Sequence, residues 1–289
     1  MGGAIRLGLA ALGLLCGLTA RAQSPVWALR GAHNTVYLAE SVHLLKAERS
    51  ALPTQFEPAY ATARTIVMEV DLSHLDAAQM QSWMLTHGTL SDATLQQVIG
   101  DPLYRRVADQ AEGLGLPMQI LQQFQPWAVA LMLADLEYVK LGYDPEWGVE
   151  QQIERRAQHD GKEILGLETL DAELGELAGL SPAEQSRFLQ LTVEDLHDAQ
   201  TETDQLLDAW RGGKTEQLAK LLASEYDSFP ELYRALITDR NARWLPQIQG
   251  YLHDSHDYLV IVGALHLVGR GGLLDLARRA GLEVTPVLN

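Results

Sequence analysis

The chain has 289 residues, of which 47% are hydrophobic and 21% are charged, and its formal net charge is -16 at pH 7. These proportions are those of a folded soluble protein and exclude a disordered or collagen-like chain. The excess of 38 Asp and Glu over 22 Lys and Arg repels phosphate groups, which argues against nucleic acid as a partner. A single cysteine, Cys16, excludes an internal disulfide and any site built from several thiolates.

The first 22 residues have the pattern of a secretory signal peptide. A basic start with Arg6 precedes an apolar run over 7–18 and the cleavage-site sequence A-R-A over 20–22. The apolar run is too short to cross a bilayer as a helix, which takes about 20 residues. We predict cleavage after Ala22, no stable membrane span afterwards, and export, to the periplasm if the source is bacterial. A buried N-terminal helix and lipidation of Cys16 are the alternatives, although a bulky leucine precedes that cysteine.

Short apolar, β-branched segments are predicted as strands, and most of the chain between them as helix. The strand candidates are 35–39 (TVYLA), 65–70 (TIVMEV), 163–167 (EILGL), 257–262 (DYLVIV) and 283–287 (EVTPV). Pro286 favours an edge position for the last of these, because proline has no N–H to donate to a neighbouring strand. Strands scattered among long helices predict an α/β (α+β) fold with a mixed central sheet.

The clearest helix start is the sequence S-P-A-E over 181–184. Serine at the N-cap, proline at the first helical position and glutamate two residues later form a capping box. Apolar residues at spacings of three and four then predict a helix of about 30 residues up to Gly212, or two helices with a break near Thr201. Further helices are predicted over 91–99, 102–112, 117–136, 147–159, 215–223, 229–252 and 272–280.

The two ends of the chain repeat one pattern of strand, x-x-x-His turn, helix and return strand. In the first copy the turn carries His43, and in the second it carries His266. We predict two related β–α–β units in one sheet, within a single domain over 23–289 that has a large helical insertion over about 90–250. Chance is the alternative, because many α/β proteins contain two such units.

Polar residues stand where the predicted strands end, and ligands bind beyond the carboxyl ends of strands in open α/β sheets. His43 and His266 follow two strands, while Glu69 and Glu168 close two others. Such a set suits a divalent metal, or acid–base catalysis without one, and the spacing does not choose between them. Arg240, on a predicted helix, could clamp a carboxylate or an oxyanion. A purely structural role is the alternative for each of these residues.

Other catalytic templates are absent. The sequence contains no G-x-S-x-G elbow, no G-x-x-x-x-G-K-[ST] phosphate loop and no G-x-G-x-x-G after a strand. A cysteine nucleophile is excluded once the signal peptide is removed.

Six short segments, in order along nearly the whole mature chain, resemble motifs of the TraB/GumN family, which also contains the Tiki proteases. They are 36–43 (VYLAESVH), 66–69 (IVME), 142–145 (GYDP) with 148–149 (GV), 166–169 (GLET), Arg240-Asn241 with Trp244, and 263–269 (GALHLVG). The resemblance implies a fold like that of the erythromycin esterase and ChaN group. It also implies a metal-dependent hydrolase site, with manganese or cobalt favoured over zinc because the Tiki branch uses them.

By this resemblance, the centre of the site is formed by the two G-x-x-H motifs and the glutamate after the second strand. These map to His43, His266 and Glu69 as metal ligands. One departure is clear: Glu40 stands where the family has the first glycine, whereas Gly263 keeps the second. A glutamate there could strain the turn or offer an extra carboxylate beside His43. A noncatalytic member of the family, which only binds its ligand, is therefore an alternative.

We accordingly expect an exported metal-dependent hydrolase, and within that class a metallopeptidase, acting on a peptide or a small molecule. Glu69 and the two motif histidines would hold the metal, Glu40 or Glu168 would act as the base, and Arg240 would stabilise the developing anion. The alternatives are a noncatalytic periplasmic binding or accessory protein, for a peptide or for export of a cell-surface polymer, and a heme or metal carrier. The sequence specifies neither the metal nor the oligomeric state.

Overall fold

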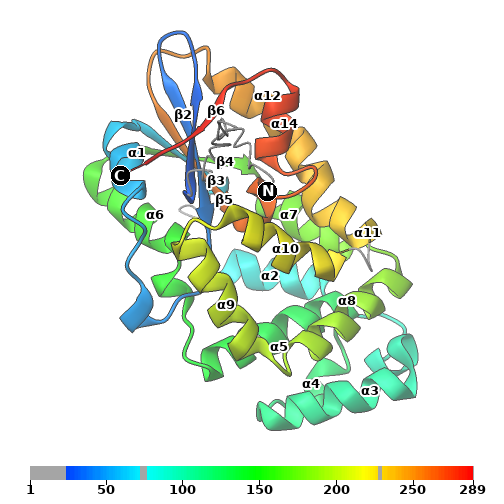
Figure 1. Cartoon of the computed structure of the whole chain (residues 1–289). Helices are drawn as coiled ribbons and strands as arrows, with labels where there is room; N and C mark the ends of the chain where they lie inside the picture. Colours follow the sequence, from blue (N-terminus) through cyan, green and yellow to red (C-terminus); the bar gives the residue numbers. More distant parts are fainter. Residues whose placement is uncertain (1–23, 72–76, 227–229, 289) are drawn as a thin grey trace, which may run out of the picture.

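Figure 1 presents the computed structural model of the chain, which describes residues 24–71, 77–226 and 230–288. The predicted signal peptide and its cleavage site lie outside these residues. Within them, no helix has the length and apolar character needed to cross a membrane.

Six strands form one mixed sheet in the order β4-β3-β5-β2-β1-β6. The first four strands in this order run parallel to one another, whereas β1 runs antiparallel to both of its neighbours. The strands are β1 (Val26–Arg30), β2 (Thr35–Ser41), β3 (Thr65–Val70), β4 (Glu163–Glu168), β5 (Tyr258–Gly263) and β6 (Val284–Pro286). The predicted fold class, α/β with a mixed central sheet, is confirmed.

All five predicted strands are present, and the sheet contains one further strand, β1. This strand forms a hairpin with β2, and the Gly31 N–H donates to the Asn34 carbonyl at 3.0 Å in the turn between them. Its apolar sequence VWAL directly follows the signal-like region, where the sequence reading assigned no strand. β6 pairs only with β1, at the edge of the sheet, as Pro286 indicated.

The two strand–turn–His units share the sheet but interleave. β2 and β5 are parallel neighbours with Ser41 opposite Gly263, so their two turns leave the sheet side by side. The return strand of the first unit, β3, lies on the other side of β5, whereas the return strand of the second, β6, lies beyond β1. β4, which falls within the predicted helical insertion, extends the sheet beside β3.

Helices flank the sheet and form a second region below it (Figure 1). α1 and α6 lie on one side of the sheet, α12 and α14 on the other, and α3, α4, α5 and α8 make up the lower region. The helices are α1 (Phe56–Thr62), α2 (Ala77–His87), α3 (Leu95–Gly113), α4 (Met118–Leu121), α5 (Pro126–Lys140), α6 (Val149–Asp160), α7 (Leu170–Ala178), α8 (Pro182–Asp195), α9 (Ala199–Arg211), α10 (Thr215–Tyr226), α11 (Pro230–Tyr233), α12 (Asp239–Tyr251), α13 (Ala264–Leu267) and α14 (Leu273–Arg279), with short η1 (Ala47–Arg49), η2 (Pro145–Trp147) and the π-helical η3 (Arg234–Thr238).

The predicted capping box begins α8. The Ser181 hydroxyl accepts from the Glu184 N–H at 3.3 Å, and the Glu184 carboxylate accepts from the Ser181 N–H at 2.9 Å. The predicted long helix is two helices, α8 and α9, and the break falls at 196–198, slightly before Thr201. α2 and α7 were not predicted.

Candidate functional site

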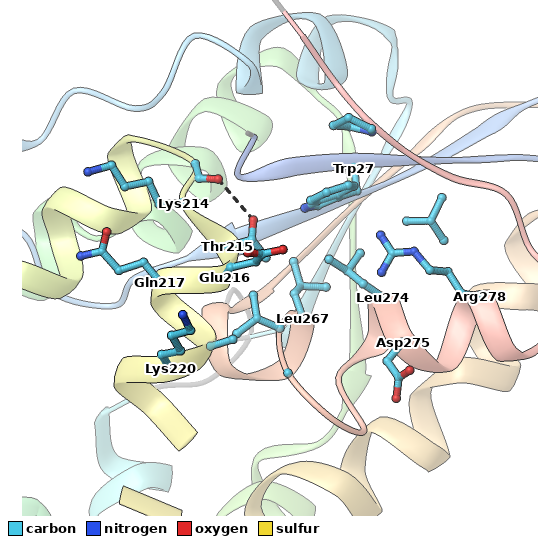
Figure 2. A pocket seen from close by; sticks show the side chains of 16 residues that line it. Trp27, Lys214, Thr215, Glu216, Gln217, Lys220, Leu267, Leu274, Asp275 and Arg278 are labelled. Atoms are coloured by element: carbon cyan, nitrogen blue, oxygen red, sulfur yellow. Dashed lines mark hydrogen bonds between the residues drawn. The ribbon is translucent and has the colours of Figure 1, made fainter. Parts of the chain in front are cut away.

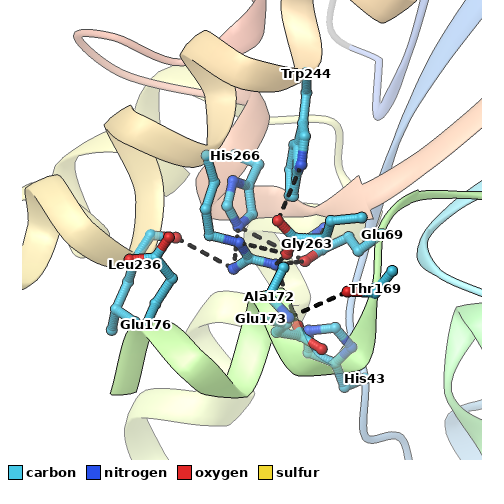
Figure 3. A network of polar contacts seen from close by, with 12 residues as sticks. His43, Glu69, Thr169, Ala172, Glu173, Glu176, Leu236, Trp244, Gly263 and His266 are labelled. Atoms are coloured by element: carbon cyan, nitrogen blue, oxygen red, sulfur yellow. Dashed lines mark hydrogen bonds and ion pairs between the residues drawn. The ribbon is translucent and has the colours of Figure 1, made fainter. Parts of the chain in front are cut away.

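The site lies at the carboxyl ends of the parallel strands. Glu69 is the penultimate residue of β3, Glu168 ends β4 and Gly263 ends β5. His43 follows β2 by two residues, and His266 lies on α13, which begins directly after β5. The structure therefore brings four of the predicted site residues and their strands to one edge of the sheet, where Arg240 of α12 joins them (Figure 3).

Arg240 is the centre of a buried ion-pair network, and only 7% of its side chain is exposed. Its Nη2 lies 2.7 Å from Glu69 Oε2 and 3.2 Å from Glu173 Oε1, and its Nε donates to Glu168 Oε1 at 2.8 Å. Burial opposes the charge, but these three carboxylates raise the pKa of Arg240, so the guanidinium stays protonated. One cation among three carboxylates leaves this part of the site acidic.

The π-helical segment η3 precedes Arg240 and helps to position it. In a π-helix the N–H group bonds to a carbonyl five residues earlier, as Asp239 does to Arg234. Arg240 Nη1 donates to the Leu236 carbonyl of this segment at 3.2 Å. The arginine is therefore held from its own helix as well as by the carboxylates.

His266 is buried and is held by Asn241. Asn241 Nδ2 donates to the carbonyls of His266 and Gly271, so its Oδ1 is the acceptor that faces His266 Nδ1 at 2.8 Å. This network assigns the proton to Nδ1 and the lone pair to Nε2, which accepts from Arg240 Nη1 at 3.2 Å. Burial lowers the pKa of His266 to about 4, and Arg240 adds to the effect, so the ring is neutral at pH 7.

Glu69 is ionised and has both oxygens engaged. Oε1 accepts from the Gly263 N–H at 2.6 Å, and Oε2 faces Arg240 Nη2. Burial favours the neutral acid, but the charges of Arg240 and His43 and the Gly263 N–H lower the pKa of Glu69. Glu173, on α7, differs: 31% of its side chain is exposed, and burial together with the charge of Glu69 raises its pKa.

His43 is the exposed member of the site, with 67% of its side chain accessible. Its Nδ1 lies 2.9 Å from Glu150 Oε1, an oxygen that also accepts from the Ser41 hydroxyl. The charge of Glu150 raises the pKa of His43, and Glu69 and Glu173 act in the same direction. His43 is therefore an imidazolium at neutral pH, fixed at Nδ1 and open at Nε2.

Gly263 leaves room between the two histidines. A Cβ atom at this position would lie 3.3 Å from Glu69 Oε1, 3.6 Å from His43 Nε2 and 3.8 Å from the His266 ring. Its φ of -50° is ordinary, so close approach rather than positive φ explains the glycine of the second motif. These distances also place His43 Nε2, Glu69 and His266 around a single point.

Glu40 is not brought to this point. Successive side chains of a strand alternate between faces, and Ser41 faces Glu150, so Glu40 faces the other side of the sheet. It is fully buried near Trp27 and Thr215, and burial raises its pKa to about 8. The backbone is not strained by the glutamate, because no described non-glycine residue has positive φ.

Glu168 is brought to the site but is fully engaged. Its Oε1 is bound by Arg240, and its Oε2 accepts from the Trp244 indole N–H at 3.2 Å. The Trp244 ring also lies 4.5 Å from the His266 ring. These contacts make Glu168 a residue that positions Arg240 and Trp244, and its predicted role as the base stays untested.

The sequence analysis did not predict that Glu150 and Glu173 belong to the site. It named Asn241 but did not predict its contact with His266. Weak signals existed for each. Glu150 directly follows a family-like GV pair, Glu173 lies one turn into the helix that Thr169 caps, and Asn241 adjoins the arginine already singled out. None of these positions indicates by itself which distant side chain it contacts.

The arrangement does not fit a resident divalent metal. Arg240 occupies the space beside Glu69 Oε2 and donates to the His266 nitrogen that a metal would need. Across residues 24–71, 77–226 and 230–288, no group of three or more His, Cys, Asp or Glu side chains is placed to hold a metal ion. The metal ligation expected of His43, His266 and Glu69 thus stays a prediction, and the Arg240 side chain would have to move first.

The fold and site define an α/β protein with a histidine–carboxylate–arginine site at the carboxyl ends of its parallel strands. The profile of the TraB/PrgY/gumN family matches residues 25–286, and the chain belongs to this family. It is similar to the uncharacterized protein YbaP of Escherichia coli (strain K12), with 23% identity over 269 residues, which cover 88% of this chain and 97% of YbaP. YbaP of Shigella flexneri matches with the same identity and coverage. No solved structure gives a significant match.

Proposed function

We propose that this protein is an exported hydrolase that cleaves peptide bonds, with His43 as its proton donor. The observation that carries the proposal is the pairing of an exposed histidine, fixed by Glu150, with a buried Arg240–Glu69 network a few ångströms away. Paired acid and base groups with displaced pKa values are typical of catalytic sites. The choice of a peptide bond rests on the resemblance to the family that includes the Tiki proteases, and export rests on the signal-like N-terminus.

In this proposal Glu173 is the base. It is the most exposed carboxylate around Arg240, and its raised pKa makes it a better proton acceptor than a freely solvated glutamate. Figure 3 shows Glu173 lying beside the His43 ring. Glu173 would take a proton from the water that attacks the carbonyl carbon. As the C–N bond breaks, His43 Nε2 would give its proton to the leaving amine.

The buried network supplies a fixed electrostatic environment for these steps. Every N–H group of Arg240 is bound within the buried network, so this guanidinium holds the surrounding carboxylates in place. The cation open to the substrate is the His43 imidazolium, whose charge would offset the charge that develops on the carbonyl oxygen. In this proposal the His43 imidazolium supplies the positive charge that a divalent metal supplies in metallopeptidases. We therefore derive no step through a metal.

The test is hydrolysis of a quenched-fluorescent peptide library by the mature protein, residues 23–289. Wild type is compared with Glu173→Gln and with the matched variant Glu176→Gln, one turn further along the same helix. Each protein is assayed after dialysis against chelator and again with manganese, cobalt or zinc, and products are identified by mass spectrometry. We expect cleavage by wild type in chelator, a loss of roughly 100-fold in Glu173→Gln, and little change in Glu176→Gln.

Three outcomes would overturn parts of the proposal. Cleavage that appears only with added metal would overturn the metal-free mechanism and support the metallopeptidase predicted from the sequence. Equal rates in wild type and Glu173→Gln would remove Glu173 as the base. A lack of cleavage under every condition would refute the peptidase and favour a noncatalytic binding protein.

A further inference from the structure

A pocket lies on the other side of α13 from the histidine site. It has a volume of about 1090 Å³, which is ample for a small organic molecule. Figure 2 shows α10 on one side of it, α14 on the other, and the Trp27 ring of β1 above. We call it the α10–α14 pocket. It contains none of the residues proposed for catalysis, although its lining residue Leu267 directly follows His266.

The pocket carries positive charge on a chain that is strongly acidic overall. Lys214, Lys220 and Arg278 line it, and within the described part of the chain none of the three forms an ion pair. Two carboxylates, Glu216 and Asp275, also line the pocket. Asp275 is already engaged, since it accepts from Arg279 and from the Gly271 N–H. Three cations in one hollow of a protein with net charge -16 favour an anionic ligand.

The rest of the lining is largely apolar. Leu267, Leu274 and Val284 contribute aliphatic surface, and the Arg278 guanidinium lies 5.5 Å from the centre of the Trp27 ring. An indole face beside a cation favours a flat, anionic ligand, because the ring contacts the body of the ligand while the cation binds its charge.

Unpaired polar atoms lie directly behind this lining. Both carboxyl oxygens of Glu40 and the Trp27 indole nitrogen are buried and form no hydrogen bond of normal geometry. Thr215, which lines the pocket, is the other neighbour of Glu40. Because burial raises the pKa of Glu40 to about 8, its carboxyl is largely neutral at pH 7 and adds little negative charge behind this wall of the pocket.

We propose that the α10–α14 pocket binds a small organic anion with a flat apolar body. Arg278, beside the Trp27 ring, binds its charged group, and Lys214 and Lys220 on the α10 side add positive potential (Figure 2). The body lies against Trp27 and the leucines of α13 and α14. This site is separate from the proposed peptidase site and does not depend on that activity.

The test uses naphthalene-2-carboxylate and its neutral isostere 2-naphthamide as probes of the mature protein, with binding measured by calorimetry. We expect one site per chain for the carboxylate and roughly tenfold or more weaker binding of the amide. The triple variant Lys214→Ala, Lys220→Ala and Arg278→Ala is expected to bind the carboxylate roughly tenfold more weakly. Ala219→Trp, which fills the pocket from α10, is expected to abolish binding of both probes.

The matched control is a triple variant that removes three exposed arginines outside the pocket, Arg64→Ala, Arg105→Ala and Arg187→Ala. It has the same change of net charge and is expected to bind the carboxylate like wild type. Circular dichroism verifies folding of each variant, and Ala219→Trp, which keeps all three cations, serves if the pocket triple variant does not fold. Equal affinity for carboxylate and amide, equal weakening in the two triple variants, or unchanged binding in Ala219→Trp would each overturn the proposal, as would no binding of the carboxylate.

Discussion

Arg240 is the residue on which the buried part of the site depends. Within the described residues it is the arginine that contacts all three of Glu69, Glu168 and Glu173, whereas Arg243 reaches Glu168 alone among them, at 3.9 Å. Buried carboxylates without a compensating cation are costly, because the interior solvates them poorly. The arginine is therefore required for stability as well as for the proposed chemistry.

Arg240→Ala is expected to lower the free energy of unfolding by about 3–5 kcal/mol at pH 7. The pKa of Glu69 is lowered in the folded protein, so the stabilisation it contributes is present above its ordinary pKa of 4.5 and is lost as the pH falls. The difference between wild type and variant should accordingly shrink below pH 4.5. Urea denaturation at several pH values measures it.

The control for this change is Arg243→Ala, three residues along the same helix. Arg243 is half exposed and pairs with Glu176 at 2.6 Å, so its removal is expected to cost less than about 1 kcal/mol. Equal effects of the two substitutions would contradict the assignment of Arg240 as the centre of the network.

The ion pair between His43 and Glu150 is expected to make the stability of the protein depend on pH. Because Glu150 raises the pKa of His43 above its ordinary 6.5, the histidine's contribution to stability is complete below pH 6.5 and is lost as the pH rises through the raised value. The pKa of Glu150 is lowered, despite the opposing effect of burial, so its contribution is present above pH 4.5 and is lost as the pH falls.

Glu150→Gln removes this charge and is expected to bring the pKa of His43 down toward 6.5. NMR titration of the His43 ring in wild type and variant measures the change. Since His43 is largely exposed, solvent limits the accompanying loss of stability. The same His43 pKa in both proteins would show that the pair does not form in solution.

At the scale of elements, the sequence predicted those helices and strands whose formation depends on interactions between neighbouring residues. The capping box at Ser181 and the β-branched strands were predicted because their signals lie within a few neighbouring residues. The break between α8 and α9 was predicted near Thr201 as one of two possibilities and lies at 196–198. The π-helical turn before Arg240 was not predicted. β1 was missed because its identity as a strand depends on pairing with β2 and β6.

Ser181→Ala tests the capping box. The substitution leaves the N–H of Glu184 without its acceptor and is expected to cost about 1 kcal/mol of stability. Ser186→Ala, within the same helix, is the matched control, since its hydroxyl only donates to the Pro182 carbonyl. Thermal or urea denaturation compares them, and a larger loss in Ser186→Ala would contradict the role assigned to the cap.

At the scale of the whole molecule, the sheet order explains why the site residues meet. Placement at strand ends predicted the meeting of His43, Glu69, Glu168 and His266, because parallel strands present their carboxyl ends at one edge. The sequence analysis did not predict that the Glu40 side chain points to the opposite face of the sheet from the site. That orientation follows from the register of β2 and from the alternation of side chains along it. The contact of His43 with Glu150 joins positions more than 100 residues apart and left no mark in the local sequence.

The histidine site and the α10–α14 pocket thus lie on either side of the neighbouring turns that follow β2 and β5. The histidine site holds an acidic, buried network with one exposed imidazolium, and the α10–α14 pocket is lined by three cations that form no ion pair with the described residues. A protein of this charge would bind a positively charged or neutral peptide segment more readily at the first and an anion at the second.

The most direct test of the central claim is the rate of peptide hydrolysis by His43→Ala in the presence of chelator. The control is His33→Ala, which removes an exposed histidine from the turn between β1 and β2. We predict a loss of roughly 100-fold in His43→Ala and an unchanged rate in His33→Ala. Equal rates in wild type and His43→Ala would contradict the account, because the exposed imidazolium would then have no part in the reaction.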